Sequence, residues 1–141
     1  MKPIPFNPQK DLAPLVFDDH ICQLALKIKR LGIRWHPHVG CFVWDPDKTI
    51  KVDSPFPHRI YFILSLPRFM DIFGSPEAIV EKLVWLPTWH QARLLCNQLN
   101  VPDDVVAGIW RGGTDLSTGE EHHKIYEVII DALQKRQDWI H

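Results

Sequence analysis

The chain has 141 residues, of which 45% are hydrophobic and 23% charged, and this is ordinary usage for one folded domain. Its formal net charge of −1 disfavours the class of proteins that hold nucleic acid through excess positive charge. Three cysteines without a CxxC pair indicate reduced thiols rather than a disulfide framework. Because no apolar run approaches the roughly 20 residues of a membrane span and the amino terminus lacks an apolar signal core, we expect a cytoplasmic protein that does not bind membranes.

Residues 1–17 contain four prolines and predict an extended arm that lies over a single domain formed by residues 18–141. Proline fixes φ and lacks a backbone N–H, so neither a helix nor a central strand suits this segment. A first helix is expected from the cap residue Asp18 to about Leu31. Its apolar residues recur at helical spacing, and Gly32 supplies the stop.

The next segments predict strands. Residues 39–44 carry apolar side chains on both faces, which is typical of a strand covered on both sides. Residues 45–48 suit a type I turn, because aspartate stands first and proline second. Residues 49–53 then predict the returning strand of a hairpin, and residues 59–66 predict a third strand. Residues 33–36 would add a fourth strand if they pair with this sheet.

Helices dominate the second half of the sequence. Several of their starts carry recognisable caps, such as Thr88 with Gln91 and Thr118 with Glu121, which match capping boxes. In chain order, we predict helices over residues 67–73, 75–86, 88–99, 102–110 and 118–138. The fold class is therefore α+β: a small three- to four-stranded antiparallel sheet, an N-terminal helix, and four to five C-terminal helices packed around it.

The densest group of possible metal ligands is His36, His38 and Cys41. Two histidines separated by one residue point to the same side of an extended backbone, and imidazole and thiolate are good zinc ligands. With His58 or His90 they would form the site of a zinc-dependent hydrolase. The spacing matches no strong zinc motif, and the alternative is that both imidazoles bond backbone carbonyls or water.

Two other chemical roles are disfavoured by their surroundings. As a nucleophile, Cys41 would need a lowered pKa, but its place in an apolar strand raises the pKa of a thiol. Arg111, followed by Gly112 and Gly113, offers a cation and flexible amides to an anionic ligand. It follows the end of a predicted helix, where the helix dipole repels anions, so a helix cap with a turn is the competing interpretation.

Residues 88–112 have the spacing of a helix-turn-helix, which makes DNA binding a further hypothesis. The first turn of its second helix carries Asp103 and Asp104 where a DNA-reading helix presents Arg, Lys, Asn or Gln. Residues 101–141 contain four Lys/Arg against eight Asp/Glu. This charge opposes phosphate binding, so nucleic acid is disfavoured as a partner.

Trp85 and Trp89 lie on either side of a predicted helix break, where side chains are often exposed. Tryptophan is enriched at the centres of binding interfaces, although it also fills cores. Our leading hypothesis is a small non-catalytic binding or regulatory module for a small molecule or a protein. Self-association as a homodimer through this aromatic surface is one form of that hypothesis.

Overall fold

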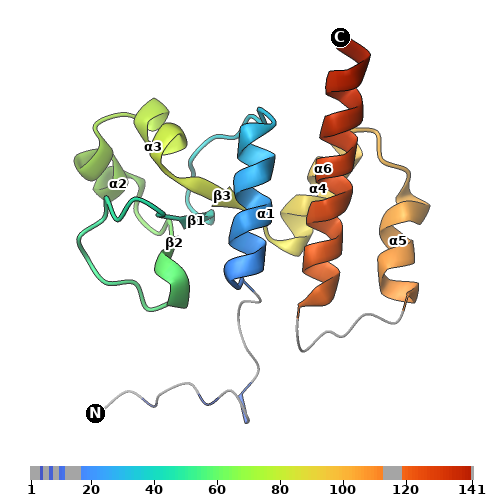
Figure 1. Ribbon diagram of the computed structural model, residues 1–141. Coiled ribbons are helices and arrows are strands. Elements are labelled where there is room, and N and C mark those ends of the chain that lie inside the picture. Colours follow the sequence, from blue (N-terminus) through green and yellow to red (C-terminus); the bar gives the residue numbers. More distant parts are fainter. Residues whose placement is uncertain (1–3, 5–6, 8–9, 12–16, 113–118, 141) are drawn as a thin grey trace.

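The computed structural model describes residues 4, 7, 10–11, 17–112 and 119–140, with side chains to residue 136 (Figure 1). These residues form six α-helices, one 3-10 turn and a three-stranded sheet, which confirms the α+β class. The elements are α1 (Asp19–Arg30), β1 (Phe42–Trp44), η1 (Pro57–Arg59), β2 (Ile60–Phe62), α2 (Leu66–Phe73), α3 (Pro76–Lys82), β3 (Val84–Leu86), α4 (Trp89–Gln98), α5 (Asp103–Arg111) and α6 (Glu120–Ile140).

The predicted helix starts are confirmed where their caps are local. Asp18 caps α1 by accepting a hydrogen bond of 2.8 Å from the Ile21 N–H. Thr88 and Gln91 form the predicted capping box of α4, with bonds of 3.2 and 2.9 Å. Gly74 ends α2 at a φ of +91°, a conformation that favours glycine. A cap satisfies orphan backbone groups with neighbouring residues, so these starts can be recognised from the sequence.

The sheet has the order β2-β1-β3, and both pairs are antiparallel. The predicted hairpin is wrong, because residues 49–53 form no strand and β1 pairs with β2 instead. The cause is the buried carboxylate of Asp45, which accepts hydrogen bonds from the N–H groups of Thr49 and Ile50 at 3.1 and 2.8 Å. These donors therefore point at a side chain rather than at a neighbouring strand. Residues 33–36 form no strand either.

The helix predicted over residues 75–86 is also wrong in its second half. It ends at Lys82, and the backbone becomes extended at Leu83 before Val84–Leu86 pairs with β1 as the third strand. Lys29 of α1 donates hydrogen bonds to the carbonyls of Glu81 and Leu83 at this break. Pairing with β1 buries Val84 and the last residue of β3 almost completely, so tertiary packing outweighs the local helical pattern.

Apolar side chains cover both faces of the sheet, as predicted. One face packs against α1, α6 packs against α1, and α4 and α5 pack against α6 (Figure 1). The other face packs against α2 and α3. The face toward α1 includes Ile60 and Val84, whereas Val43 and Tyr61 lie on the opposite face. Val39 departs from the predicted pattern: the strand begins later, at Phe42, and the Val39 side chain is 58% exposed.

The predicted arm over residues 1–17 and the loop and capping box around residues 111–118 lie mostly outside the described residues. Within the part that is described, no helix combines the length and apolar character needed to cross a membrane.

Candidate functional site

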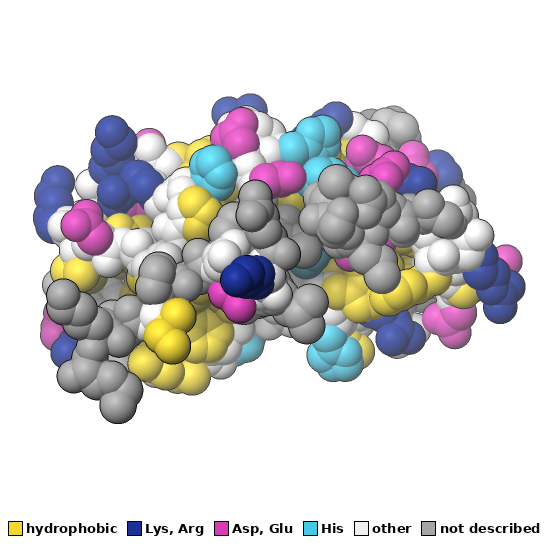
Figure 2. Space-filling model, turned by 90° about the horizontal axis from the view of Figure 1, so that it is seen from below, with side chains coloured by type: hydrophobic (Ala, Val, Ile, Leu, Met, Phe, Trp, Pro, Cys, Tyr) yellow, Lys and Arg dark blue, Asp and Glu magenta, His cyan; other side chains and the backbone are white. Residues whose placement is uncertain are grey.

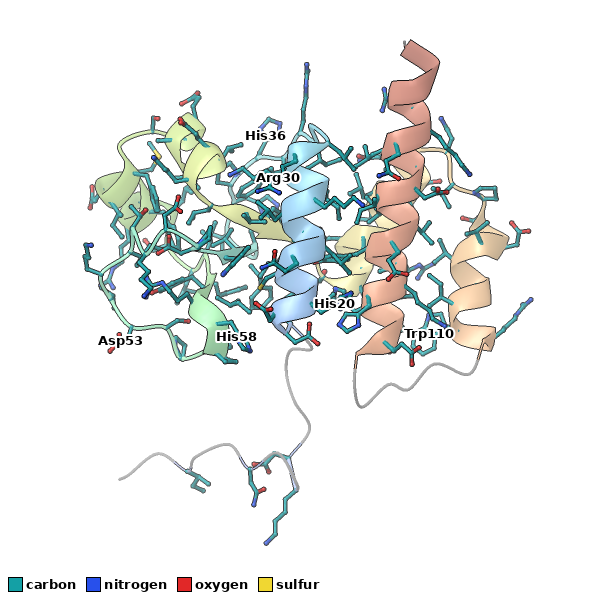
Figure 3. The ribbon with its side chains drawn as sticks, viewed as in Figure 1. His20, Arg30, His36, Asp53, His58 and Trp110 are labelled. Carbon is teal, nitrogen blue, oxygen red and sulfur yellow. The ribbon has the colours of Figure 1, made fainter. Side chains whose placement is uncertain are left out.

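A hollow of about 420 Å³ lies where the segment after α1 meets β3 and α4. We call it the aromatic groove. It is lined by Arg34, Trp35, His36, His38, Trp85, Gln91, Leu94, Leu95 and Gln98. Its volume is within the range of small-molecule sites, and its walls combine aromatic and aliphatic side chains with a few polar groups, as such sites do. Figure 3 shows His36 at the same end of the molecule as Arg30, the last residue of α1.

Two stacked indoles form one wall of the aromatic groove. The rings of Trp35 and Trp85 lie 5.9 Å apart at an interplanar angle of 12°. Trp35 is 8% exposed and Trp85 is half-buried, so the pair is packed into the fold rather than projecting from it. The Trp85 Nε1–H is buried and has no hydrogen-bond partner among the described residues. Buried indole N–H groups are ordinarily paired, so this donor is an exception in the described structure.

The rim of the aromatic groove is polar. His36 and His38 are both exposed. The His38 Nδ1 lies 2.9 Å from the Val39 carbonyl, which can only accept, so Nδ1 carries the proton and Nε2 remains available. The Gln91 Oε1 caps α4, which leaves its amide donors for other partners. The Arg34 guanidinium makes no hydrogen bond or ion pair with the described part of the chain.

A second hollow, of about 620 Å³, continues from the aromatic groove toward α6. Arg34, Leu95 and Gln98 line both hollows, so the two meet along one side of α4. The second hollow adds Arg136 of α6 to the lining. Among described residues neither hollow is lined by Asp or Glu, so the charged groups of their lining are the arginines Arg34 and Arg136.

The structure brings three predicted site residues together, because His36, His38 and Trp85 line one hollow. Cys41 is separate from them: it is fully buried on the sheet face that packs against α2 and α3. Its Sγ lies 3.9 Å from the His36 carbonyl rather than from an imidazole. Burial raises the pKa of the Cys41 thiol, which disfavours the thiolate form needed for metal binding or catalysis.

Trp89 and Arg111 lie away from the aromatic groove. Trp89 packs edge-to-face on Trp110, with ring centroids 5.5 Å apart, and is half-buried. Arg111 is the exposed last residue of α5. The aromatic surface expected around Trp85 and Trp89 is therefore divided between two sites.

The other two hypotheses meet different obstacles. In the described ranges no group of three or more His, Cys, Asp and Glu side chains is arranged to hold a metal ion. The helix-turn-helix-like segment does form two successive helices, α4 and α5, with Val106 and Ile109 packed in the core. The first turn of α5 nevertheless exposes Asp103 and Asp104, and these carboxylates oppose contact with phosphates.

A cluster of histidines that the sequence interpretation missed lies where α1 and α6 begin. His123 Nε2 lies 3.0 and 3.1 Å from the two carboxylate oxygens of Asp18, and the His20 and His123 rings are 4.6 Å apart. Figure 3 shows His20 between the lower ends of α1 and α6, and Figure 2 shows histidines beside acidic side chains on this face. A signal was present, because His20 follows a predicted cap and two histidines open the last helix.

This cluster is held together by internal hydrogen bonds. Burial acts to raise the pKa of Asp18, but hydrogen bonds from Ile21 and His123, with the nearby imidazoles, outweigh it and leave that pKa below its usual value. His122 is buried, and its Nε2–H donates to the Pro87 carbonyl at 2.9 Å. Burial lowers the pKa of His122. Asp18 caps α1 and contacts His123 of α6, and His122 ties α6 to the Pro87 carbonyl. These contacts give the cluster a structural role.

A second internal cluster organises residues 45–60. The Arg59 Nη2 lies 2.9 Å from the Asp45 carboxylate and 2.6 Å from the Ile50 carbonyl. Its Nε donates to the Asp45 carbonyl at 3.3 Å, and the Tyr61 hydroxyl donates to the Val52 carbonyl at 2.5 Å. Arg59 itself adopts a positive φ of 62°. These bonds hold a long segment whose regular structure is limited to η1, and they satisfy the polar groups of Asp45, Arg59 and Tyr61 within the fold.

No protein-family model matches this chain, and no match was found among curated proteins or solved structures.

Proposed function

We propose that this protein is a small binding module that holds a small-molecule ligand in the aromatic groove. The observation that carries the proposal is the convergence of His36, His38 and the partly buried Trp85 on one hollow. An apolar hollow with a few converging polar groups is the usual form of a ligand site. The stacked indoles of Trp35 and Trp85 support the same conclusion, because they give the hollow a broad aromatic wall.

The cysteine thiols favour binding over nucleophilic catalysis. All three are buried, and burial raises the pKa of Cys22 to about 12 and that of Cys96 to about 11. A thiol with so high a pKa carries almost no thiolate at neutral pH. A binding module uses the aromatic groove without any of these groups.

The proposal is tested by blocking the aromatic groove with a matched pair of variants. Gln98 and Asn97 are adjacent exposed residues of α4, but Gln98 lines the aromatic groove whereas Asn97 lines a different hollow, between α4 and α5. A library of small aromatic compounds is screened by NMR against the wild-type protein, and the bound members are titrated into Gln98→Trp and Asn97→Trp. We expect Gln98→Trp to abolish binding and Asn97→Trp to leave it unchanged.

Three results would contradict the proposal. Equal loss of binding in both variants would mean that the effect is not specific to the groove. Retained binding in Gln98→Trp would place the ligand elsewhere. Absence of any bound library member would remove the basis for a small-molecule site.

A further inference from the structure

We propose that the ligand is a small organic anion, with a flat apolar body against the Trp-lined wall and a carboxylate or phosphate group at Arg34. This inference rests on the proposed function and goes further, because it names the chemistry of the ligand. Arg34 lies at the junction of the two hollows, and its guanidinium donors bond no described residue.

The lining charges separate this pair of hollows from the others in the described structure. The aromatic groove and its continuation carry Arg34 and Arg136 but no carboxylate from the residues described. The hollow between α5 and α6 carries Lys124 and Lys135 together with two acidic residues, and Lys135 pairs with Asp131 at 3.0 Å. A hollow lined by cations without compensating carboxylates has a positive potential that attracts anions.

The hollow between α4 and α5 gives a second contrast. It is lined by Arg93 and His90, but Asp103 shares the same lining. Its positive charge is therefore partly offset, whereas nothing described offsets the charge of Arg34 in the aromatic groove. This makes Arg93 a suitable control: it is an exposed arginine on α4 that lines a hollow of similar size, about 540 Å³.

Arg34 has the donors that an anionic oxygen group requires. A guanidinium presents five N–H donors in a planar fork that matches carboxylate and phosphate geometry. Arg59 donates hydrogen bonds from its guanidinium to acceptors within the fold, but Arg34 bonds no described residue. Because Arg34 lines both hollows, an anion held there places the rest of the ligand over Trp85 and Leu94 of the aromatic groove.

The walls of the groove specify the body of the ligand. Trp35, Trp85, Leu94 and Leu95 offer aromatic and aliphatic surface, and Leu94 is 52% exposed although it is apolar. A flat apolar ring covers such a surface more completely than a polar or highly branched group. Arg34 and the exposed imidazoles then face the charged end of the ligand.

Three probes that share one ring system test this inference on the full chain: 2-naphthoate, 2-naphthyl phosphate and the neutral 2-naphthamide. Affinities are measured by NMR titration, following the indole N–H signal of Trp85. We expect at least one anion to bind about tenfold more tightly than the amide, the order of magnitude of one charge-assisted hydrogen bond. The preference between the two anions distinguishes a carboxylate from a phosphate ligand.

Arginine variants assign the charge effect to its residue. Arg34→Gln should lower the affinity for the anion about tenfold and leave the affinity for 2-naphthamide unchanged. Arg34→Lys keeps the charge but not the fork, so it should give an intermediate loss. Arg93→Gln, the control, should bind the anion like the wild type.

The outcomes separate this inference from the proposed function. If the amide binds the groove as tightly as both anions, the groove is a ligand site but the anionic class is wrong. If Arg34→Gln and Arg93→Gln weaken the anion equally, the effect comes from overall charge and the role of Arg34 is wrong. If none of the three probes shifts the Trp85 signal or any other groove signal, both the inference and the proposed function fail.

Discussion

Two segments outside the α-helices and strands, residues 31–41 and residues 45–59, each carry an arginine, but the two arginines are used differently. Arg59 bonds a buried carboxylate and two backbone carbonyls, and its guanidinium carbon lies 5.8 Å from the centre of the Tyr61 ring. Arg34 lies between two hollows and bonds nothing in the described chain. Both segments join elements around the same sheet, yet only Arg59 is bonded within the fold, whereas the Arg34 guanidinium bonds no described residue.

This difference shows that a polar residue in a loop indicates function only when the fold does not use it. Buried polar groups must be paired, and the segment of residues 45–59 meets this need with Asp45 and Arg59. The aromatic groove instead retains a guanidinium, that of Arg34, which is unpaired among the described residues. Substitutions at the two arginines and around them should therefore separate stability from binding.

The largest effect is expected for Asp45→Ala. The substitution leaves two backbone N–H donors and the Arg59 guanidinium without their acceptor, in a place where the carboxylate is 0% exposed. We expect a loss of about 3 kcal/mol in the free energy of unfolding, measured by urea denaturation. The exposed Asp47→Ala is the control and should change stability by less than about 0.5 kcal/mol. Similar losses in the two variants would remove the distinction between the internal cluster and the surface.

The next effect concerns the pH dependence of stability and extends the comparison to His122. Because burial lowers the pKa of His122, the unfolded chain takes up a proton at a higher pH than the folded chain. The contribution of His122 to the free energy of unfolding is therefore fully present above about pH 6.5. It is lost as the pH decreases, by at most about 1.4 kcal/mol per pH unit.

His122→Gln should remove that contribution and flatten the curve of unfolding free energy between about pH 6.5 and pH 5. The comparison variant is His90→Gln, which changes an exposed histidine near the start of α4. If the unfolding free energy of His122→Gln depends on pH as steeply as that of His90→Gln, the buried His122 is not the source of the pH dependence.

The smallest effect is expected for the stability of Arg34→Gln. Since Arg34 is exposed and bonds no described residue, its loss should change the free energy of unfolding by less than about 0.5 kcal/mol. Arg59→Gln, made in parallel, should lower the denaturation midpoint because three hydrogen bonds are lost. A lower midpoint for Arg34→Gln than for Arg59→Gln would reverse the assignment of the two arginines.

The sequence predicted the starts of most helices and the class of fold because their signals are local. Asp18 and Thr88 cap helices through residues three positions away, and glycine ends α2. The strand pairing was not predictable in the same way. Asp45 suited a hairpin turn by its type and position, but the structure uses its carboxylate to bind the following backbone. Val84 fits the apolar stripe of a predicted helix, but in the structure it belongs to β3 and pairs with β1.

The candidate site was predictable only in part. His36, His38 and Trp85 were recognised by residue type, and the fold brings them together although 47 positions separate His38 from Trp85 in the sequence. Cys41 was grouped with the histidines as a possible ligand by residue type, but its place in an apolar strand also predicted burial, and the structure buries it with Val43. Arg34 gave no signal of its own, since its importance depends on α4 and α6 contributing no carboxylate to the same hollows.

The most direct test of this comparison is a titration of the wild-type protein with 2-naphthoate, followed in the backbone and indole ¹H–¹⁵N signals of the whole chain. We predict that the shifts concentrate in residues 31–38, in Trp85 and in residues 91–98, and that residues 45–59 remain unchanged. Shifts centred on residues 45–59, or spread evenly over the surface, would contradict the assignment of the aromatic groove as the ligand site.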